Sequence, residues 1–338
     1  MARASRDRAG LWLALGLCAM VAVFLASLCV GQYPLSMGEV ADALMGGDNG
    51  ETANNVVWRL RMPRLIAACL VGVALSVAGM VYQATFRNEL ASPDIIGVSS
   101  GASVGIALGL LAGMPLLWIS VSGFFAGVSA MALTLALARL FRNKSMTILI
   151  ISGVLVSGLM GSAVSMIKSV ANADTVLPNI VFWLMGSFSN VSAAHVFALV
   201  ATVPLCVAFL LLISGKILNS LMLGPEHARS KGVNYRRWRA IVLAFATVLT
   251  ALSVAVAGVV GWAGLVVPHV ARLVAGHSAQ RSMPLAIAFG GAFMMACDTL
   301  SRSLTASEIP VGAITGFLGI ILFISILAFK RGQRYGDN

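Results

Sequence analysis

The chain has 338 residues, of which 59% are hydrophobic and only 10% are charged. Such a composition lacks the polar atoms needed to cover a soluble globule, so the chain belongs in a lipid bilayer. Since one spanning helix takes about 20 apolar residues, little length is left for a catalytic domain. The net charge of +11 then serves to hold loops on the cytoplasmic side, and we expect no nucleic-acid partner.

Eight stretches contain no Asp, Glu, Lys or Arg and are candidates for spanning helices. They are residues 9–38, 65–86, 95–138, 145–167, 175–215, 240–271, 282–297 and 309–329. The third is long enough for two helices, with a turn at Gly113-Met114-Pro115. Residues 175–215 and 240–276 could each hold one span or two.

Charge decides between these possibilities. Both termini are basic, which favours two cytoplasmic ends and an even number of spans. Ten spans result if residues 240–276 form two, and the most basic loop then faces the cytoplasm. That loop carries Lys216, Arg229, Lys231, Arg236, Arg237 and Arg239. The sequence thus predicts an all-α polytopic membrane protein of about ten helices, a single domain over residues 1–338.

Two longer segments, residues 32–62 and 172–192, then lie outside. Ser36 as an N-cap, followed by helical spacing to Met45, predicts a short helix on the outer surface. Phe182 in the second segment suits an interfacial half-helix. This topology leaves five basic residues outside, against the positive-inside bias: Arg59, Arg61, Arg64, Lys168 and Arg302.

Polar residues at the outer ends of two spans admit two interpretations each. Arg61 and Arg64 flank Pro63 at the start of the second span, where they either snorkel to lipid headgroups or serve a function. Asp298 and Arg302 stand one helical turn apart. An i,i+4 ion pair there competes with a functional role for an intramembrane acid.

Three further motifs are equally open. Small residues crowd positions 97–105, where they either pack helices or line a wet path. His269 follows a helix-bending Pro268 and either makes a structural hydrogen bond or acts as a ligand or proton relay. Residues 218–233 mix apolar and polar side chains at helical spacing, either as a plain positive-inside loop or as a helix that enters a partner's groove. In the second case the docking residues would be Leu221, Leu223 and Ala228.

Several motifs are absent from the sequence. It contains no G-x-x-x-x-G-K-[ST], H-E-x-x-H or G-x-S-x-G, and no set of carboxylates within its apolar runs. The five cysteines lie in apolar runs without a C-x-x-C pair, so we expect neither disulfides nor a bound metal. We therefore predict no catalytic residue, and a transporter with no energy source of its own remains.

The motifs together resemble the permease subunits of ABC importers for iron–siderophore complexes, haem and vitamin B12, the FecCD-type or type II importers. The resemblance extends over nearly the whole chain. It is carried by residues 61–64, Gly79, Gln83, residues 87–93 and 97–102, Trp183, residues 186–187, 218–219 and 223–224, Ala228, residues 232–233 and 264–272, Asp298, Arg302 and residues 308–312.

This resemblance implies a ten-helix permease in the bacterial inner membrane, paired with a second permease subunit, with a homodimer favoured. Two cytoplasmic ATPase subunits would hold the ATP and magnesium, so no cofactor is expected on this chain. A periplasmic or lipid-anchored substrate-binding protein would deliver the cargo. An Fe(III)–siderophore is the first expectation for that cargo, then haem or cobalamin, with an oxyanion such as molybdate open.

The resemblance also implies roles for particular residues. A coupling segment at about 218–235 would contact the ATPase through Leu218, Asn219, Leu221, Leu223, Gly224, Ala228, Gly232 and Val233. Acidic residues of the binding protein would dock on Arg61, Arg64 and Arg302. The cytoplasmic gate or the path would involve Gln83, Asn88, Leu90, Ser99, Ser100, Ser145, Met146 and Thr147.

The sequence departs from the family pattern at two functional positions. Glu89 stands where Asn-Pro-Leu-Ala has proline, which puts a carboxylate near the expected gate. Pro225 interrupts the usual Leu-Gly-acid pattern of the coupling segment. The alternative function, a self-contained secondary transporter or channel, would depend on intramembrane ionisable groups, for which the candidates are Asp298, His195 and His269.

Overall fold

The computed structural model describes residues 2–47, 51–141 and 146–336. Within them, seven helices are long and apolar enough to cross a membrane, and three shorter apolar helices accompany them. Together they account for the ten predicted spans: α1 (Ala2–Cys29), α4 (Met62–Phe86), α5 (Val98–Leu111), α6 (Leu116–Leu140), α7 (Met146–Val170), α9 (Ala193–Ile213), α12 (Tyr235–Ala257), α13 (Ala263–Ala275), α14 (Ala279–Ser303) and α15 (Val311–Gly336). The predicted fold class is confirmed.

Short helices join the spans, most of them at the two ends of the bundle. They are α2 (Met37–Met45), α3 (Glu51–Asn55), the π-helix η1 (Val56–Arg61), η2 (Pro93–Ile96), α8 (Val176–Leu184), the π-helix η3 (Ser214–Leu218), α10 (Asn219–Leu223) and α11 (Pro225–Ser230). The outer helix predicted after Ser36 is present as α2. Ser36 Oγ accepts a hydrogen bond from the Glu39 amide, and the Glu39 carboxylate accepts one from the Ser36 amide, so a capping box begins this helix.

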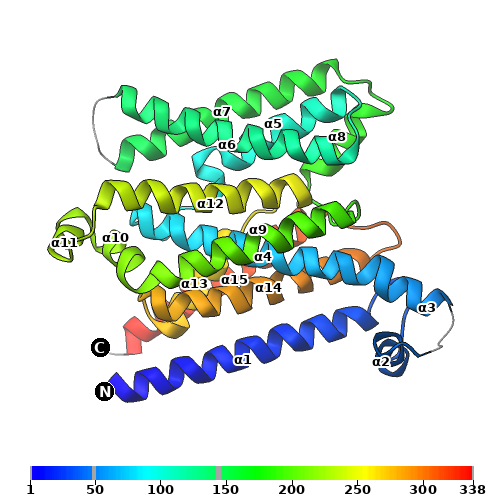
Figure 1. The fold of residues 1–338 in the computed structure, drawn as a ribbon, viewed down its shortest axis with the longest axis horizontal. Coiled ribbons are helices and arrows are strands. Elements are labelled where there is room, and N and C mark those ends of the chain that lie inside the picture. The colour runs from blue at the N-terminus through cyan, green and yellow to red at the C-terminus, as the bar shows by residue number, and fades with distance from the viewer. Residues whose placement is uncertain (1, 48–50, 142–145, 337–338) are drawn as a thin grey trace.

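The two ambiguous stretches are resolved as the charge argument predicts. Residues 240–276 contribute to two helices, α12 and α13, whereas residues 175–215 contribute the half-helix α8 and one span, α9. In Figure 1 the start of α1 and the end of α15 lie at the same end of the bundle as α10 and α11. The helices α2, α3 and α8 lie at the opposite end. By the positive-inside bias we name the first the cytoplasmic end and the second the outer end.

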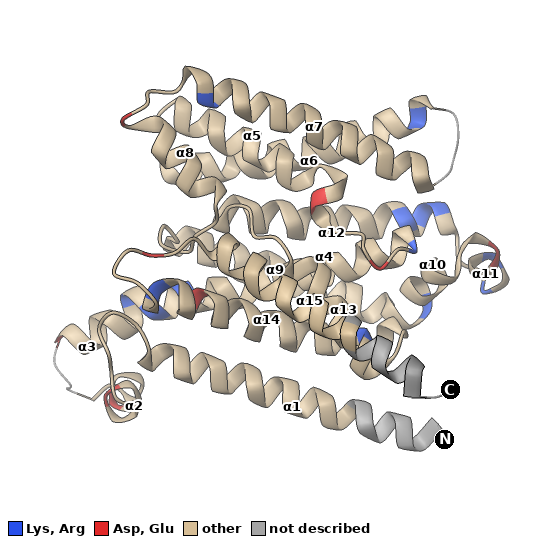
Figure 2. Ribbon diagram, turned by 180° about the vertical axis from the view of Figure 1, so that it is seen from behind, with Lys and Arg blue, Asp and Glu red and all other residues tan. Residues whose placement is uncertain are grey.

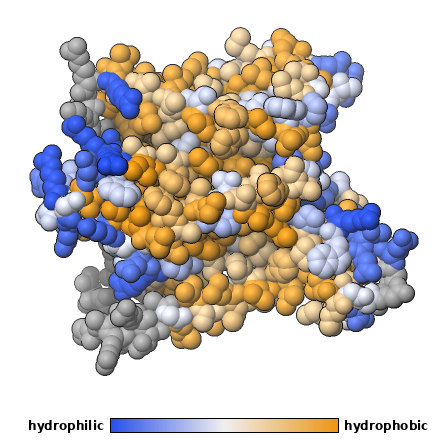
Figure 3. Space-filling model, viewed as in Figure 1, coloured by the Kyte–Doolittle hydropathy of each residue, from blue (hydrophilic) through white to orange (hydrophobic). Residues whose placement is uncertain are grey.

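Charged residues gather at these two ends. Figure 2 shows Lys and Arg around α10, α11 and the start of α12, and a second group beside acidic residues at the start of α4. Between the ends, the surface in Figure 3 is mostly apolar. A bundle with an apolar waist and polar ends matches the profile of a bilayer.

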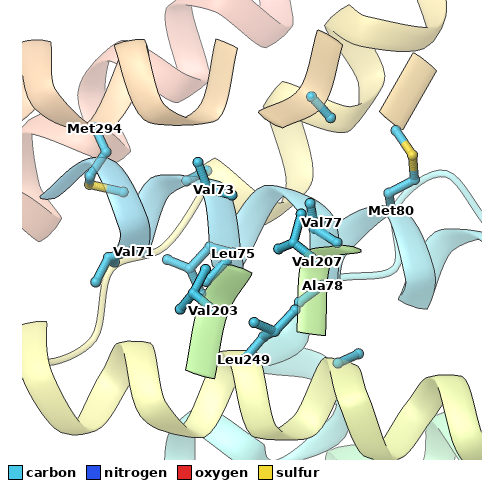
Figure 4. Close-up of a cluster of buried hydrophobic side chains, with 14 of the residues drawn as sticks. Val71, Val73, Leu75, Val77, Ala78, Met80, Val203, Val207, Leu249 and Met294 are labelled. Atoms are coloured by element: carbon cyan, nitrogen blue, oxygen red, sulfur yellow. The ribbon is translucent and has the colours of Figure 1, made fainter. Parts of the chain in front are cut away.

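Helix α4 forms the centre of the bundle and packs against α9, α12, α13 and α14. Protein surrounds this helix, and most of its side chains are apolar on every face. Figure 4 shows Val73 and Leu75 of α4 packed among Val203 of α9, Leu249 of α12 and Met294 of α14. Helix α4 is therefore a tightly packed central helix that connects the outer and cytoplasmic ends.

Glycines bring two neighbouring helices into direct backbone contact with α4. A Cβ atom at Gly79 would lie 1.8 Å from the carbonyl oxygen of Gly264 in α13, and one at Gly72 would lie 2.1 Å from that of Gly290 in α14. Neither neighbour is a flexible side chain, so the backbones themselves would have to separate. Small residues thus set the helix spacing here, as is common in membranes.

We predict that Gly79→Ala destabilises the protein by about 1–3 kcal/mol, the usual cost of overpacking. Gly161→Ala in α7 is the matched control, because a Cβ there meets no atom within 4 Å. Thermal unfolding midpoints of the two purified variants measure the difference. Equal midpoints would show that α4 and α13 separate freely.

Candidate functional site

The predicted docking arginines lie together at the outer end. Arg61 is the last residue of η1, Arg64 is in the first turn of α4, and Arg302 is in the last turn of α14. Asp298 in α14 and Glu308 in the loop before α15 join them. We call these five residues the outer arginine cluster; its blue and red segments are adjacent at the start of α4 in Figure 2.

Arg61 and Arg302 cap the outer end of α1. Arg302 donates a hydrogen bond to the carbonyl of Ser27, and Arg61 donates to the carbonyls of Leu28 and Tyr33. The carbonyls at a helix C-terminus lack partners within the helix and form the negative end of its dipole. The neighbouring carbonyls, of Ala26 and Cys29, accept hydrogen bonds from backbone amides. Every carbonyl in the last turn of α1 therefore has a hydrogen-bond partner.

Both of these guanidinium groups therefore face the protein. Arg61 is 5% exposed and Arg302 is 7% exposed. Their burial does not fit snorkelling to lipid headgroups, and docking of a partner on them stays a prediction. Helix capping is a third role, which the sequence could not reveal because the carbonyls come from a segment about 30 positions from Arg61 and still further from Arg302.

Arg64 binds both acids of the cluster. Its Nε donates to Asp298 Oδ1 at 2.8 Å, and its Nη1 and Nη2 donate to the two carboxylate oxygens of Glu308 at 2.6 and 3.0 Å. The predicted i,i+4 pair between Arg302 and Asp298 is present, but its 3.8 Å distance is longer than the 2.8 Å between Arg64 and Asp298. The fully buried Asp298 therefore has its closest charge partner on another helix.

A cavity of about 400 Å³ opens beside this cluster. Arg61, Arg64, Arg302 and Glu308 line it, together with Gln32, Tyr33, Arg59, Pro63 and Phe188 among others. Arg59, which is exposed on η1, adds a cation that the family pattern did not single out. The cavity is wide enough and cationic enough to admit an acidic side chain from a partner.

The coupling segment at the cytoplasmic end divides into buried and exposed residues. Leu218, Leu221 and Ala228 are fully buried and Val233 is 3% exposed, whereas Leu223 is 63% exposed. The hypothesis that three apolar residues enter a partner's groove therefore narrows to Leu223. The other apolar residues attach the segment to its own chain.

Backbone geometry explains the two glycines of this segment. Gly224 has φ +103° at the turn between α10 and α11, a conformation that favours glycine. Pro225 is the first residue of α11, a position that suits proline, so it begins a helix rather than interrupting one.

Gly232, with φ +69°, ends α11 in a Schellman motif. The Val233 amide donates to the Ala228 carbonyl at 2.8 Å, and the Gly232 amide donates to the Arg229 carbonyl at 3.0 Å.

Asn219 connects the segment to α14. Its Oδ1 accepts from the Ala279 amide at 2.8 Å, at the first residue of α14. Its Nδ2 donates to the Gly215 carbonyl at 3.0 Å and lies 3.3 Å from Ser278 Oγ. Asn219 thus transmits the position of α10 to the start of α14.

The predicted gate residues lie at the cytoplasmic end, in the loop after α4 and at the start of α7. Asn88 Oδ1 accepts from the Leu90 amide at 2.9 Å, and Leu90 is 55% exposed. Met146 and Thr147 begin α7. Ser145 lies outside the described residues. We call residues 87–92 the gate loop.

The predicted path residues are mostly buried in the chain. Gln83 donates to the Leu265 carbonyl at 3.2 Å and accepts from Arg272, which links α4 to α13. Ser99 is 5% exposed, and Ser100 is partly exposed. These positions stay predictions as path residues.

Glu89, the departure from the family pattern, lies between two histidines. Its carboxylate is 3.4 Å from His269 Nδ1 and 3.5 Å from His277 Nε2, beside a cavity of about 160 Å³ that Arg272 also lines. The His269 ring also packs edge-on against the Phe323 ring, with 5.8 Å between the ring centroids. The carboxylate partner of His269 comes from the gate loop, so helical spacing around His269 could not reveal this pair.

Among the described residues, no group of three or more His, Cys, Asp or Glu side chains could hold a metal ion. A helical bundle with outer and cytoplasmic polar sites and a protruding cytoplasmic helix pair has the architecture of a membrane transport permease.

Comparison with known proteins supports this class. The FecCD transport family matches residues 19–329. The chain is 33% identical over 318 residues to the molybdate import system permease protein MolB of Haemophilus influenzae, covering 93% of this chain and 94% of that one. It is 37% identical over 290 residues to the vitamin B12 import system permease protein BtuC of Serratia proteamaculans, covering 85% of each.

A solved structure has the same fold. An ABC transporter assigned to the metal-chelate type, in an inward-facing conformation, matches with a TM-score of 0.84 and 34% identity over 94% of this chain and 98% of that one. The chain belongs to the FecCD transport family. It is a multi-pass membrane permease of the ABC importer type and a non-catalytic component.

We predict that Arg61→Gln loosens the outer end of α1. Leaving the buried Leu28 carbonyl without its partner costs about 1–3 kcal/mol, so amide hydrogen exchange over residues 26–35 should accelerate. Arg59→Gln, which removes an exposed arginine of the same segment, should leave that exchange unchanged. Unchanged protection in the Arg61 variant would contradict the capping role.

Proposed function

We propose that this chain is the membrane half of an ATP-driven importer for a metal chelate or a metal-containing cofactor. Two copies would pair, each above one cytoplasmic ATPase, and a substrate-binding protein would dock on the outer end. An Fe(III)–siderophore is the first candidate cargo, with haem, cobalamin and molybdate as the others. The observation that carries the proposal is the family match, together with Leu223 exposed on a protruding cytoplasmic helix pair.

The contacts of the coupling segment support a route from an ATPase to the gate. A displacement of α10 and α11 would be transmitted to α14 through the hydrogen bond between Asn219 and the Ala279 amide. It would also reach α4, because α10 packs directly against that helix. Arg87 ends α4 in the left-handed region, with φ +50°. Closure of the ATPase pair would thus move the ends of α4 and α14 together and open the path alternately to each side.

The partners of the three candidate ionisable groups disfavour the alternative of ion-driven transport. Asp298 is paired with Arg64, and His269 faces Glu89. His195 accepts a hydrogen bond from the Ser192 amide through Nδ1, so its Nε2 donates to Ser120 Oγ at 2.9 Å. Each candidate therefore has a structural partner inside the protein.

We predict that Leu223→Asp weakens the contact with the ATPase and lowers transport and stimulated ATP hydrolysis together. Placing a carboxylate in an apolar groove costs several kcal/mol, which is at least a tenfold loss of affinity for the ATPase. Uptake and stimulated ATP hydrolysis in proteoliposomes should fall together while membrane insertion is kept.

The matched control is Ser230→Asp, which adds the same charge at an exposed position of α11. It should transport like the parent chain. Normal uptake by the Leu223 variant would dismiss this segment as the coupling element.

The whole proposal is tested by purification and reconstitution. We expect an ATPase to co-elute with the permease, and uptake of a labelled ferric siderophore to require ATP and a binding protein. Parallel assays with haem, cobalamin and molybdate identify the cargo. Uptake driven by a proton or sodium gradient without an ATPase would establish the alternative.

A further inference from the structure

Within the outer arginine cluster, Arg64 holds two carboxylates of different accessibility. The Asp298 side chain is fully buried, whereas that of Glu308 is 27% exposed and Arg64 itself is 12% exposed. Glu308 lines the 400 Å³ cavity and Asp298 does not. A carboxylate that enters this cavity therefore meets Arg64 on the side that Glu308 occupies.

The other two arginines are not available in the same way. Arg61 and Arg302 also line the cavity, but each already donates to carbonyls at the end of α1, so a partner would compete with that cap for them. Glu308, in contrast, is held by two parallel hydrogen bonds that any other carboxylate reproduces. Exchange of one carboxylate for another leaves Arg64 paired throughout.

Release of Glu308 would act on the start of α15. Glu308 lies in the loop between α14 and α15, and that loop is connected to the outer half-helix. The Val311 amide donates to the Gly186 carbonyl at 2.9 Å, and the Gly312 amide donates to the Met185 carbonyl at 3.1 Å, just after α8. The next amide, of Ser187, donates to the carbonyl of Ala257 at the end of α12, at 2.9 Å.

These contacts form one chain from Arg64 to the outer ends of three helices. The junction of α15, α8 and α12 is tight, since a Cβ at Gly312 would lie 2.3 Å from the Met185 carbonyl oxygen. A displacement that reaches Val311 and Gly312 finds no free space at this junction, and α8 and α15 would then shift together.

We propose that Glu308 is a resident stand-in for an acidic side chain of the substrate-binding protein. On docking, the partner's carboxylate replaces Glu308 on Arg64, and the released loop allows α8 and α15 to move at the outer mouth. This inference rests on the proposed function, because it takes docking at the outer arginine cluster as given. It makes Glu308 a positioning residue and Arg64 the contact.

The test compares three variants of the permease–ATPase complex in nanodiscs: Glu308→Gln, Arg64→Gln and Asp42→Asn. The probe is the binding protein that supports ATP-dependent uptake in the assay above, and its Kd is measured at low ionic strength. Glu308→Gln removes the competing carboxylate, so the Kd of the binding protein should fall about threefold to fivefold. This is the factor expected for one ion pair at the edge of solvent. Arg64→Gln should weaken docking.

Asp42→Asn controls for general electrostatics, because it removes one exposed negative charge from the outer helix α2, away from the cavity. It should dock like the parent chain. Equal tightening by Asp42→Asn would overturn the exchange, since bulk charge would then explain the effect.

A spin label at Ala306→Cys reports the loop directly. Its mobility should rise when the binding protein is added to the parent chain, and should already be high in Glu308→Gln. If Arg64→Gln weakens docking while Glu308→Gln does not tighten it, the exchange is wrong and docking at Arg64 stands. If neither variant changes the Kd, docking at the cluster itself fails.

Discussion

A carboxylate buried in a membrane helix must be neutralised, and in this protein the neutralisation of Asp298 brings four segments of the chain together. Arg64 pairs with it from α4, Arg302 lies near it within α14, and Glu308 completes the coordination of Arg64 from the loop before α15. Arg302 and Arg61 then carry the contact on to the end of α1. Removal of Asp298 would leave Glu308 as the one carboxylate of the cluster against its three arginines.

In the proposed function this cluster is connected to the predicted gate, because α4 begins at the cluster and ends at residues 87–92. The helix is surrounded by protein and held to α13 and α14 by direct backbone contact at glycines, so it transmits displacement rather than absorbing it. The same helix also contacts α10 of the coupling segment. The outer arginine cluster thus lies at one end of α4, and the coupling segment contacts the same helix.

The coupling segment shows how far local sequence can be taken. Its helical spacing and its place in a basic loop were sufficient to predict a cytoplasmic helical element, and the residues matched by the family pattern do shape it. Most of them, however, make contacts within this chain. Gly232 and Ala228 form a helix terminus, and Asn219 binds the start of α14. Only Leu223 combines an apolar side chain with high exposure. A sequence motif does not distinguish the residues that are exposed to a partner from the buried residues that hold the segment in place.

The sequence by itself determined the membrane class, the ten spans and the choice of which ambiguous stretch is double, because hydropathy and the distribution of Lys and Arg are properties of local composition. Tertiary structure alone decided the partners of the charged residues. Asp298 pairs with Arg64 across 234 positions, Arg302 reaches a carbonyl 275 positions away, and Glu89 meets His269 on another helix. No periodicity records such pairs, since they depend on where separate helices end in space.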